Sequence, residues 1–212
     1  MMGAAISYLP SINKPKATVI IAIFSGILYA FPAKIGDEFM KLLHLGSFAT
    51  FFGTQFWVTL VSGVVMYNVL PRQMFGLLQS KMFPKYFLAG TFFSSVALSS
   101  YVANIPVRIW SGDQKIQGWL LGLMLASNAA NYYVIEPITT AQMFKCHKYE
   151  REHGESGQEV GIPLSKGLQS DKTYMELRGM FFKLHAVSSL VNMVSLGCSS
   201  AYLWYLAKSL NW

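Results

Sequence analysis

Glu136 is the residue whose type and position most strongly suggest chemistry in this sequence. It lies in an apolar stretch, 116–140, with Tyr132 one helical turn before it and Asn128 two turns before it. Helical spacing puts the three side chains on one face. A carboxyl group inside an apolar segment is costly unless it is partnered, and such groups often mark ion or substrate pathways. This stretch is therefore the first candidate for a functional site.

Arg178 and His185 are possible partners for Glu136. Both belong to a polar stripe that follows the 3.6-residue period toward the carboxyl end of the chain. We expect an intramembrane polar cluster made of Glu136, Arg178, His185, Asn128 and Asn192. The simpler explanation of these residues is a charge pair that fixes helix register without turnover, because no nucleophile with an adjacent base accompanies them.

Histidines raise the question of a metal or haem site. His44 and His185 begin helices that enter the membrane from opposite sides, so they should lie about 20 Å apart in depth and cannot share one iron. Cys146, His147 and His153 lack the repeated spacing of a zinc site. No Walker loop, GxGxxG turn or GxSxG elbow occurs in the sequence. We expect no bound metal, no haem or copper cofactor, and no enzymatic activity.

Long apolar segments must position these residues. Of the 212 residues, 53% are hydrophobic and 13% are charged, which is typical of a protein in lipid. Five runs of about 20 residues or more are each long enough for one membrane crossing: 17–33, 42–70, 86–110, 116–140 and 181–207. The prediction is an all-α integral membrane bundle.

We divide the chain into an amino-terminal extension, 1–41, and an antiparallel four-helix core, 42–212, with an aqueous loop at 144–180. The extension carries the extra membrane helix at 17–33. A cleaved signal peptide is the alternative for that segment, although Leu28/Ala30 and Phe31/Ala33 make poor cleavage sites.

The distribution of Lys and Arg predicts the orientation. The amino-terminus, the 71–85 turn and the 141–183 loop hold twelve of these residues, and the opposite side holds five. Basic residues favour the cytosolic side, so the carboxyl-terminus is expected in a lumen or outside the cell, in an endomembrane or the plasma membrane. The net charge of +7 does not indicate nucleic-acid binding, because the basic residues stand singly at segment ends.

Other residues predict packing and interface contacts. Gly118, Gly122, Ala126 and Ala130 recur every four positions, a stripe that lets another helix approach closely. Arg72, Lys81 and Lys85 are interleaved with apolar residues in a pattern that suits the headgroup layer. The fourth helix is expected to continue to Gly154, residues 154–170 to form a loop, and Asp171 to cap the last helix.

Several stretches, in order, resemble the transmembrane protein 205 family over about residues 42–207. They are FWVTLVSG (56–63), LPRQMFGLLQSKMFPKYF (70–87), the IEPITTAQM run that contains Glu136, and Tyr174/Leu177/Arg178 followed by FFKLHAVSSLVN (181–192). The resemblance implies a four-helix membrane core without catalytic residues, linked to platinum-drug tolerance through export or vesicle traffic. It also implies a distant likeness to CopD-like copper-resistance and haem-binding membrane proteins, which is an analogy of fold.

Two functions follow as hypotheses. The first is a structural or adaptor component that contacts the bilayer and other membrane proteins or self-associates. The alternative is a transporter or a metal- or haem-handling protein that uses the Glu136, Arg178 and His185 cluster.

Overall fold

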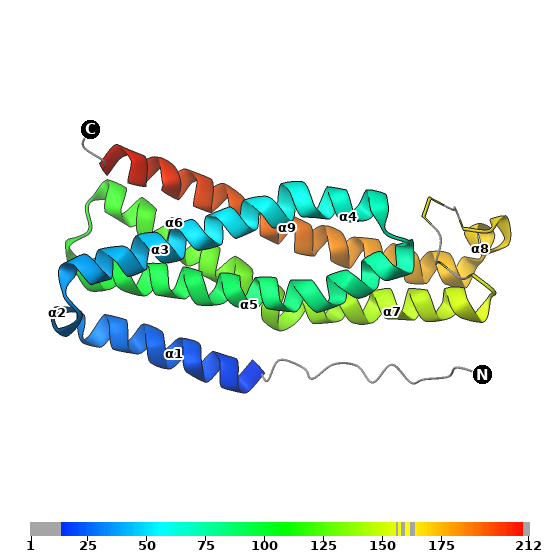
Figure 1. Cartoon of the computed structure of the whole chain (residues 1–212), viewed down its shortest axis with the longest axis horizontal. Helices are drawn as coiled ribbons and strands as arrows, with labels where there is room; N and C mark the ends of the chain where they lie inside the picture. Colours follow the sequence, from blue (N-terminus) through cyan, green and yellow to red (C-terminus); the bar gives the residue numbers. More distant parts are fainter. Residues whose placement is uncertain (1–13, 156, 158–159, 162–163, 210–212) are drawn as a thin grey trace.

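The computed structural model describes residues 14–209 except 156, 158–159 and 162–163, and shows helices without strands in that part of the chain. Figure 1 shows an elongated bundle whose long helices run side by side. One end holds α2, the start of α6 and the end of α9, and is called the far end. The other end holds the α4–α5 turn, the end of α7 and α8, and is called the loop end.

The first half of the chain makes three rods. The first is α1 (Lys14–Ala30), which the short α2 (Pro32–Ile35) joins to the second. The second rod is α3 (Asp37–Phe56), the π-helical turn η1 (Trp57–Ser62) and α4 (Gly63–Val69) in continuous succession. After Pro71, α5 (Arg72–Asn104) runs back toward the far end. The predicted segment 17–33 therefore overlaps α1, which begins three residues earlier and ends at Ala30, before the predicted end.

The second half makes two further rods. A short 3₁₀ turn, η2 (Val107–Ile109), leads to α6 (Gly112–Ala130), the π-helical turn η3 (Asn131–Ile135) and α7 (Glu136–Glu152). Ser111 and Gln114 form a capping box that fixes the start of α6. The short α8 (Lys166–Ser170) then precedes α9 (Lys172–Ser209).

Two local predictions in the loop region are confirmed and one is wrong. The helix ends beside Gly154, which has a φ of +80° that favours glycine. Asp171 caps α9, because its Oδ1 accepts from the Tyr174 backbone N–H at 2.7 Å. Residues 154–170 are not all loop, since Ser165 caps α8 through the Leu168 backbone N–H.

Three of the described helical rods are long and apolar enough to cross a membrane: Asp37–Val69, Arg72–Asn104 and Lys172–Ser209. The rod Gly112–Glu152 is not among them, and serine and asparagine side chains at 127, 128 and 131 interrupt its apolar run. With 17 residues, α1 is at the short limit for a crossing. The crossings predicted at 17–33 and 116–140 stay predictions.

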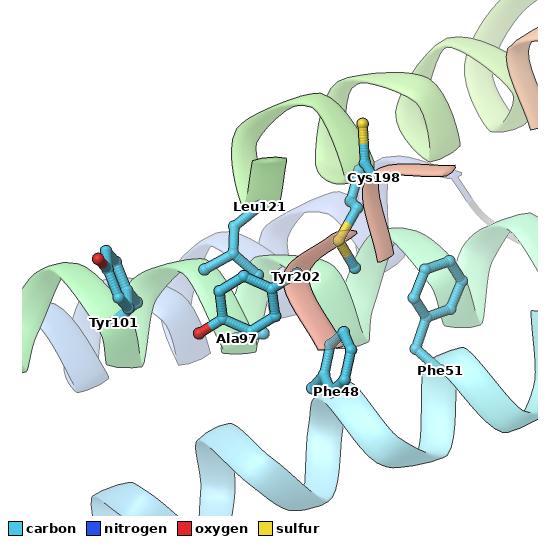
Figure 2. Packing of buried hydrophobic residues seen from close by; sticks show 8 residues of the cluster. Phe48, Phe51, Ala97, Tyr101, Leu121, Cys198 and Tyr202 are labelled. Carbon is cyan, nitrogen blue, oxygen red and sulfur yellow. The ribbon is translucent and has the colours of Figure 1, made fainter. Parts of the chain in front are cut away.

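The packed core binds the rods together. Near the far end, Tyr202 of α9 lies among Phe48, Ala97 and Leu121 from α3, α5 and α6 (Figure 2). Along the bundle, α5 packs against α1, α3 and α6, while α9 packs against α6 and α7. α5 is thus the central helix, and α1 lies at the edge (Figure 1).

Candidate functional site

A layer of neutral hydrogen bonds crosses the middle of the bundle at Asn192. Its Oδ1 accepts from Tyr86 Oη at 2.8 Å, and its Nδ2 donates to Thr59 Oγ1 at 2.9 Å. Gln55, whose side chain is fully buried, accepts from Ser199 Oγ at 2.9 Å. These contacts join the second rod, α5 and α9. They satisfy polar groups that would be costly if buried alone.

Asn128 and Asn131 continue this layer on the fourth rod. Asn128 Nδ2 donates to Ser195 Oγ at 3.1 Å, and Asn131 Oδ1 accepts from Ser188 Oγ at 2.7 Å. Asn128 Oδ1 is buried without a hydrogen-bond partner and lies against Gly90, where a Cβ atom would clash with it. Gly90 is therefore required by the close approach of the amide.

The π-helical turn η3 leaves one backbone carbonyl without its usual partner. The Glu136 N–H bonds to the Asn131 carbonyl, five residues back, so the next bond in this register would run from residue 137 to Tyr132. Pro137 has no N–H to donate. Lys14 Nζ bonds to the Tyr132 carbonyl instead, at 3.0 Å, and so fastens the start of α1 to the fourth rod.

Glu136 lies beside this junction. Its side chain is 7% exposed, and its Oε1 accepts from Thr140 Oγ1 at 2.7 Å. Lys14 is the nearby charge that acts on it. The sequence did not lead to Lys14 as a partner, because only the tertiary fold brings α1 to η3.

The expected pairing of Glu136 with Arg178 or His185 is wrong for this structure. The Arg178 guanidinium lies 5.2 Å from the Phe182 ring centre and 6.0 Å from that of Tyr174. His185 is exposed and stacks on Phe181. Among the described residues, ion pairs join Arg72 to Glu150 and Lys148 to Glu152, and none includes Glu136. The predicted cluster separates into the Asn128 and Asn192 layer, the Glu136 junction, a half-buried Arg178 beside Tyr174, and an exposed His185.

His44 is a packing residue near the far end. Its Nδ1 lies 2.9 Å from the Ala97 carbonyl oxygen, and its Nε2 lies 2.7 Å from Tyr202 Oη. Because a carbonyl can only accept, Nδ1 carries the proton and Nε2 accepts from the tyrosine. Both ring nitrogens are therefore used between helices. Within the described residues, no group of three or more His, Cys, Asp or Glu side chains is arranged to hold a metal ion.

A second polar centre lies at the loop end around Glu150, which is 2% exposed. Its Oε1 accepts from Tyr174 Oη at 2.6 Å, and its Oε2 accepts from Gln73 Nε2 at 3.1 Å and from Arg72 Nη2 at 3.2 Å. We call these four residues the Glu150 cluster. It joins α5, α7 and α9 and so closes the loop end.

Neighbouring residues extend the Glu150 cluster. The Gln73 backbone N–H donates to the Gly157 carbonyl at 3.2 Å. Gly157 has a φ of +57° and lies so close to the Gln73 side chain that a Cβ atom would clash, so glycine is required there. Burial lowers the pKa of His147 from its ordinary value and raises the pKa of the Cys146 thiol to about 11. At neutral pH both side chains are therefore uncharged.

Two further predictions about packing and interface need correction. A Cβ atom at Gly118 would meet the Trp110 ring, one at Gly122 would meet open space, and Ala126 is exposed. Gly118, Gly122 and Ala126 therefore meet no other helix backbone among the described residues, while Ala130 is half-buried. Leu121, Met124 and Asn128 are buried on α6. Arg72 turns inward to Glu150, whereas Lys85 is exposed and Lys81 half-buried.

Sequence reasoning missed Glu150 and Gln55. Glu150 follows Met143 and His147 at helical spacing, on a face that the structure buries, and this was the available signal. Gln55 stands in the uncharged run 42–70 as one of its few strongly polar side chains. Their partners Tyr174 and Ser199 lie far away in the sequence and could not be paired from spacing alone.

Comparisons with known proteins identify the family. A model of a domain of unknown function, DUF4149, matches residues 46–148. The chain is 31% identical over 178 residues to Transmembrane protein 205 of Danio rerio, an alignment that covers 82% of this chain and 94% of that protein. No solved structure matches the chain. With this identity and coverage, the chain belongs to the transmembrane protein 205 family.

Proposed function

We propose that this integral membrane protein is an adaptor without a chemical step, which crosses the bilayer with its far-end half and projects its loop end toward a partner membrane protein. The observation that carries the proposal is an exposed apolar face on the projecting part. It comprises Tyr67 and Val69 of α4 with Met74 and Leu78 of α5, and is called the α4–α5 face.

Charged residues mark the level at which the bundle leaves the bilayer. Lys14 contacts the carbonyl beside Glu136, and Lys85 lies near Ala17 of α1. The Asn131–Ser188 contact places Lys183 at a similar level. From there to Lys208, α9 carries no charged residue, a length of about 36 Å that suits a hydrocarbon core of about 30 Å.

The helices continue well past this level. α7 runs from Glu136 to Glu152, about 24 Å further. The Glu150 cluster near its end joins three helices, and this supports a rigid extension rather than fraying ends. A rigid projection is what an adaptor requires, because a partner can then meet a preformed surface.

The α4–α5 face lies on this extension. The Tyr67 ring packs 5.8 Å from the ring of Phe75, which is about 15 Å along α5 from Lys85. Tyr67 is 71% exposed and Leu78 is 41% exposed. Clustered exposed apolar side chains are typical of interaction sites. Since the face begins close to the bilayer, a partner held in the same membrane fits it best.

The basic residues indicate how the protein is oriented in the membrane. Lys and Arg concentrate on the loop-end segments, so we place the loop end in the cytosol and the carboxyl-terminus on the opposite side. The fourth rod (α6, η3 and α7) and α1 are taken as further crossings, with the fourth rod packed against α5 and α9.

Site-specific photo-crosslinking in native membranes tests the adaptor proposal. A benzophenone side chain at position 78 should capture one discrete protein partner, while the same group at position 148 should not. Lys148 is a matched control because its side chain is 72% exposed on the same projecting half. Identical capture at both positions, or none at position 78, would contradict the proposal.

A transport role centred on Glu136 is the competing function. Its support is a buried carboxyl group beside Lys14. The two proposals differ in cells exposed to a platinum drug: under the adaptor proposal Leu78→Asp lowers tolerance and Glu136→Gln leaves it intact. The reverse pattern would favour transport.

A further inference from the structure

An apolar groove lies open to the surface between α1 and α5. Its volume is about 350 Å³, and its walls are formed by Ala17, Ile20 and Ile21 of α1 and by Leu88, Ala89 and Phe92 of α5. Lys85 is the charged residue in its lining. The groove is therefore apolar along its length and cationic at one end.

The contacts at the two ends of α1 explain why a space remains between α1 and α5. Toward the far end, α1 lies close to α5, with Ser25 Oγ 2.6 Å from Ser95 Oγ and Leu28 packed against Val96. At its start it turns instead toward η3, where Lys14 and Thr18 bond to Tyr132 and Tyr133. Between these attachments the small side chains of Ala17 and Ala89 do not fill the space between the two helices.

The charges at the groove end favour an anionic headgroup. Lys85 is exposed and forms no ion pair with any described residue. Lys14 bonds to a neutral carbonyl, which leaves its positive charge, and Glu136 is the acidic group that acts against it. A lysine near the membrane surface attracts anionic lipid, and its long stem can lie along apolar surface while its ammonium reaches the headgroup layer.

We propose that this groove binds an anionic phospholipid, with one acyl chain between α1 and α5 and the phosphate against Lys85. The apolar walls select a hydrocarbon chain, and the single cationic end selects the headgroup. The proposal rests on α1 and α5 lying in the bilayer and is independent of the α4–α5 face, so failure of crosslinking at position 78 would leave it standing.

Lipid-dependent thermal unfolding of the purified full chain in detergent tests the proposal. Phosphatidylglycerol should raise the Tm of the wild-type protein more than phosphatidylcholine does. Lys85→Gln should weaken the apparent affinity for phosphatidylglycerol by about fivefold and leave the response to phosphatidylcholine unchanged. Lys81→Gln, one turn away on the same helix, should behave as wild type.

Filling the groove gives a second arm of the test. Ala89→Phe should place a ring in the empty space and abolish the response to both lipids, and retained lipid adducts in native mass spectra should fall in parallel. If Ala89→Phe unfolds, the proposal is still tested by comparing the lipid adducts that Lys85→Gln and Lys81→Gln retain. Equal phosphatidylglycerol retention by wild type and Lys85→Gln would overturn the proposal.

Discussion

The two halves of the bundle hold their helices together with different chemistry. At the middle of the bundle and toward the far end, hydrogen bonds between neutral side chains join the rods, such as those of Tyr86 and Thr59 with Asn192 and of Ser195 with Asn128. At the loop end, the helices are joined through an acidic side chain, Glu150, which pairs with Arg72. Under the proposed membrane placement, the difference follows the distance of each half from water.

The cost of burying charge accounts for this division. Inside a bilayer an ion pair loses hydration on all sides, whereas neutral amides and hydroxyls can pair with one another or with backbone carbonyls. Ser94 and Ser100, for example, donate to the carbonyls four residues before them. At the loop end the side chain of Arg72 is 33% exposed, so it keeps part of its hydration while it pairs with Glu150.

Of the substitutions considered, removal of the Glu150 side chain should lower the free energy of unfolding most. Glu150→Ala leaves Arg72, Gln73 and Tyr174 without their common acceptor, which should cost about 3 kcal/mol. Unfolding of the purified protein in mixed detergent and SDS measures the loss. Glu152→Ala is the control, because its pair with Lys148 is exposed and worth little. Equal losses in the two variants would refute the role of the cluster.

A neutral core residue should matter less. Asn192→Leu removes the partner of Tyr86 Oη and Thr59 Oγ1 and should lower the free energy of unfolding by about 1 kcal/mol, since hydrogen bonds between membrane helices are modest. The same SDS titration measures it. A loss as large as that of Glu150→Ala would contradict the contrast drawn between the halves.

The effects of substituting Lys14 and Pro137 on the stability of the α1 attachment should not be additive. The interaction free energy between the two substitutions should be about 0.5 kcal/mol. Lys14→Met removes the donor to the Tyr132 carbonyl and should destabilise the attachment of α1. Pro137→Ala restores a backbone N–H that can take its place, so the lysine substitution should cost less in that background. Hydrogen exchange along α1 reports the attachment. Strict additivity of the two changes would rule out the explanation.

A fall in pH should slightly lower the local stability of the loop end around His147. The folded-state pKa of His147 lies below the ordinary value of 6.5, with burial as the first cause, Arg151 and Arg72 adding to it and Glu150 opposing it. The unfolded chain therefore takes up a proton first, so this contribution to stability is present above pH 6.5 and is lost as pH falls toward the folded pKa.

Hydrogen exchange of residues 142–152, corrected for the intrinsic rate, should rise by about threefold between pH 7 and pH 5.5. His147→Gln should remove most of that rise, while His153→Gln, an exposed ring on the same side of the cluster, should keep it. An unchanged rise in the His147 variant would show that another group controls the loop end.

Local residue patterns predicted where helices begin and end, but they did not predict which helices lie next to one another. Asp171 and Gly154 predicted helix ends because caps depend on a few adjacent residues. In the structure Asn128 is buried and Asn192 is half-buried, and both side chains form hydrogen bonds to other helices, as a polar residue in an apolar run requires. Glu136 was assigned the wrong partners, because helical spacing fixes a face but does not reveal which rod covers it.

Composition and hydropathy alone determined that this protein is a helical membrane protein, because apolar runs of bilayer length can satisfy their backbone only as helices. The sequence also shows directly where charged residues interrupt those apolar runs. The tertiary structure alone decided that α1 turns toward η3, that Glu150 gathers donors from α5 and α9, and that a groove remains beside Lys85. These features depend on contacts between residues far apart in the chain, which no local pattern specifies.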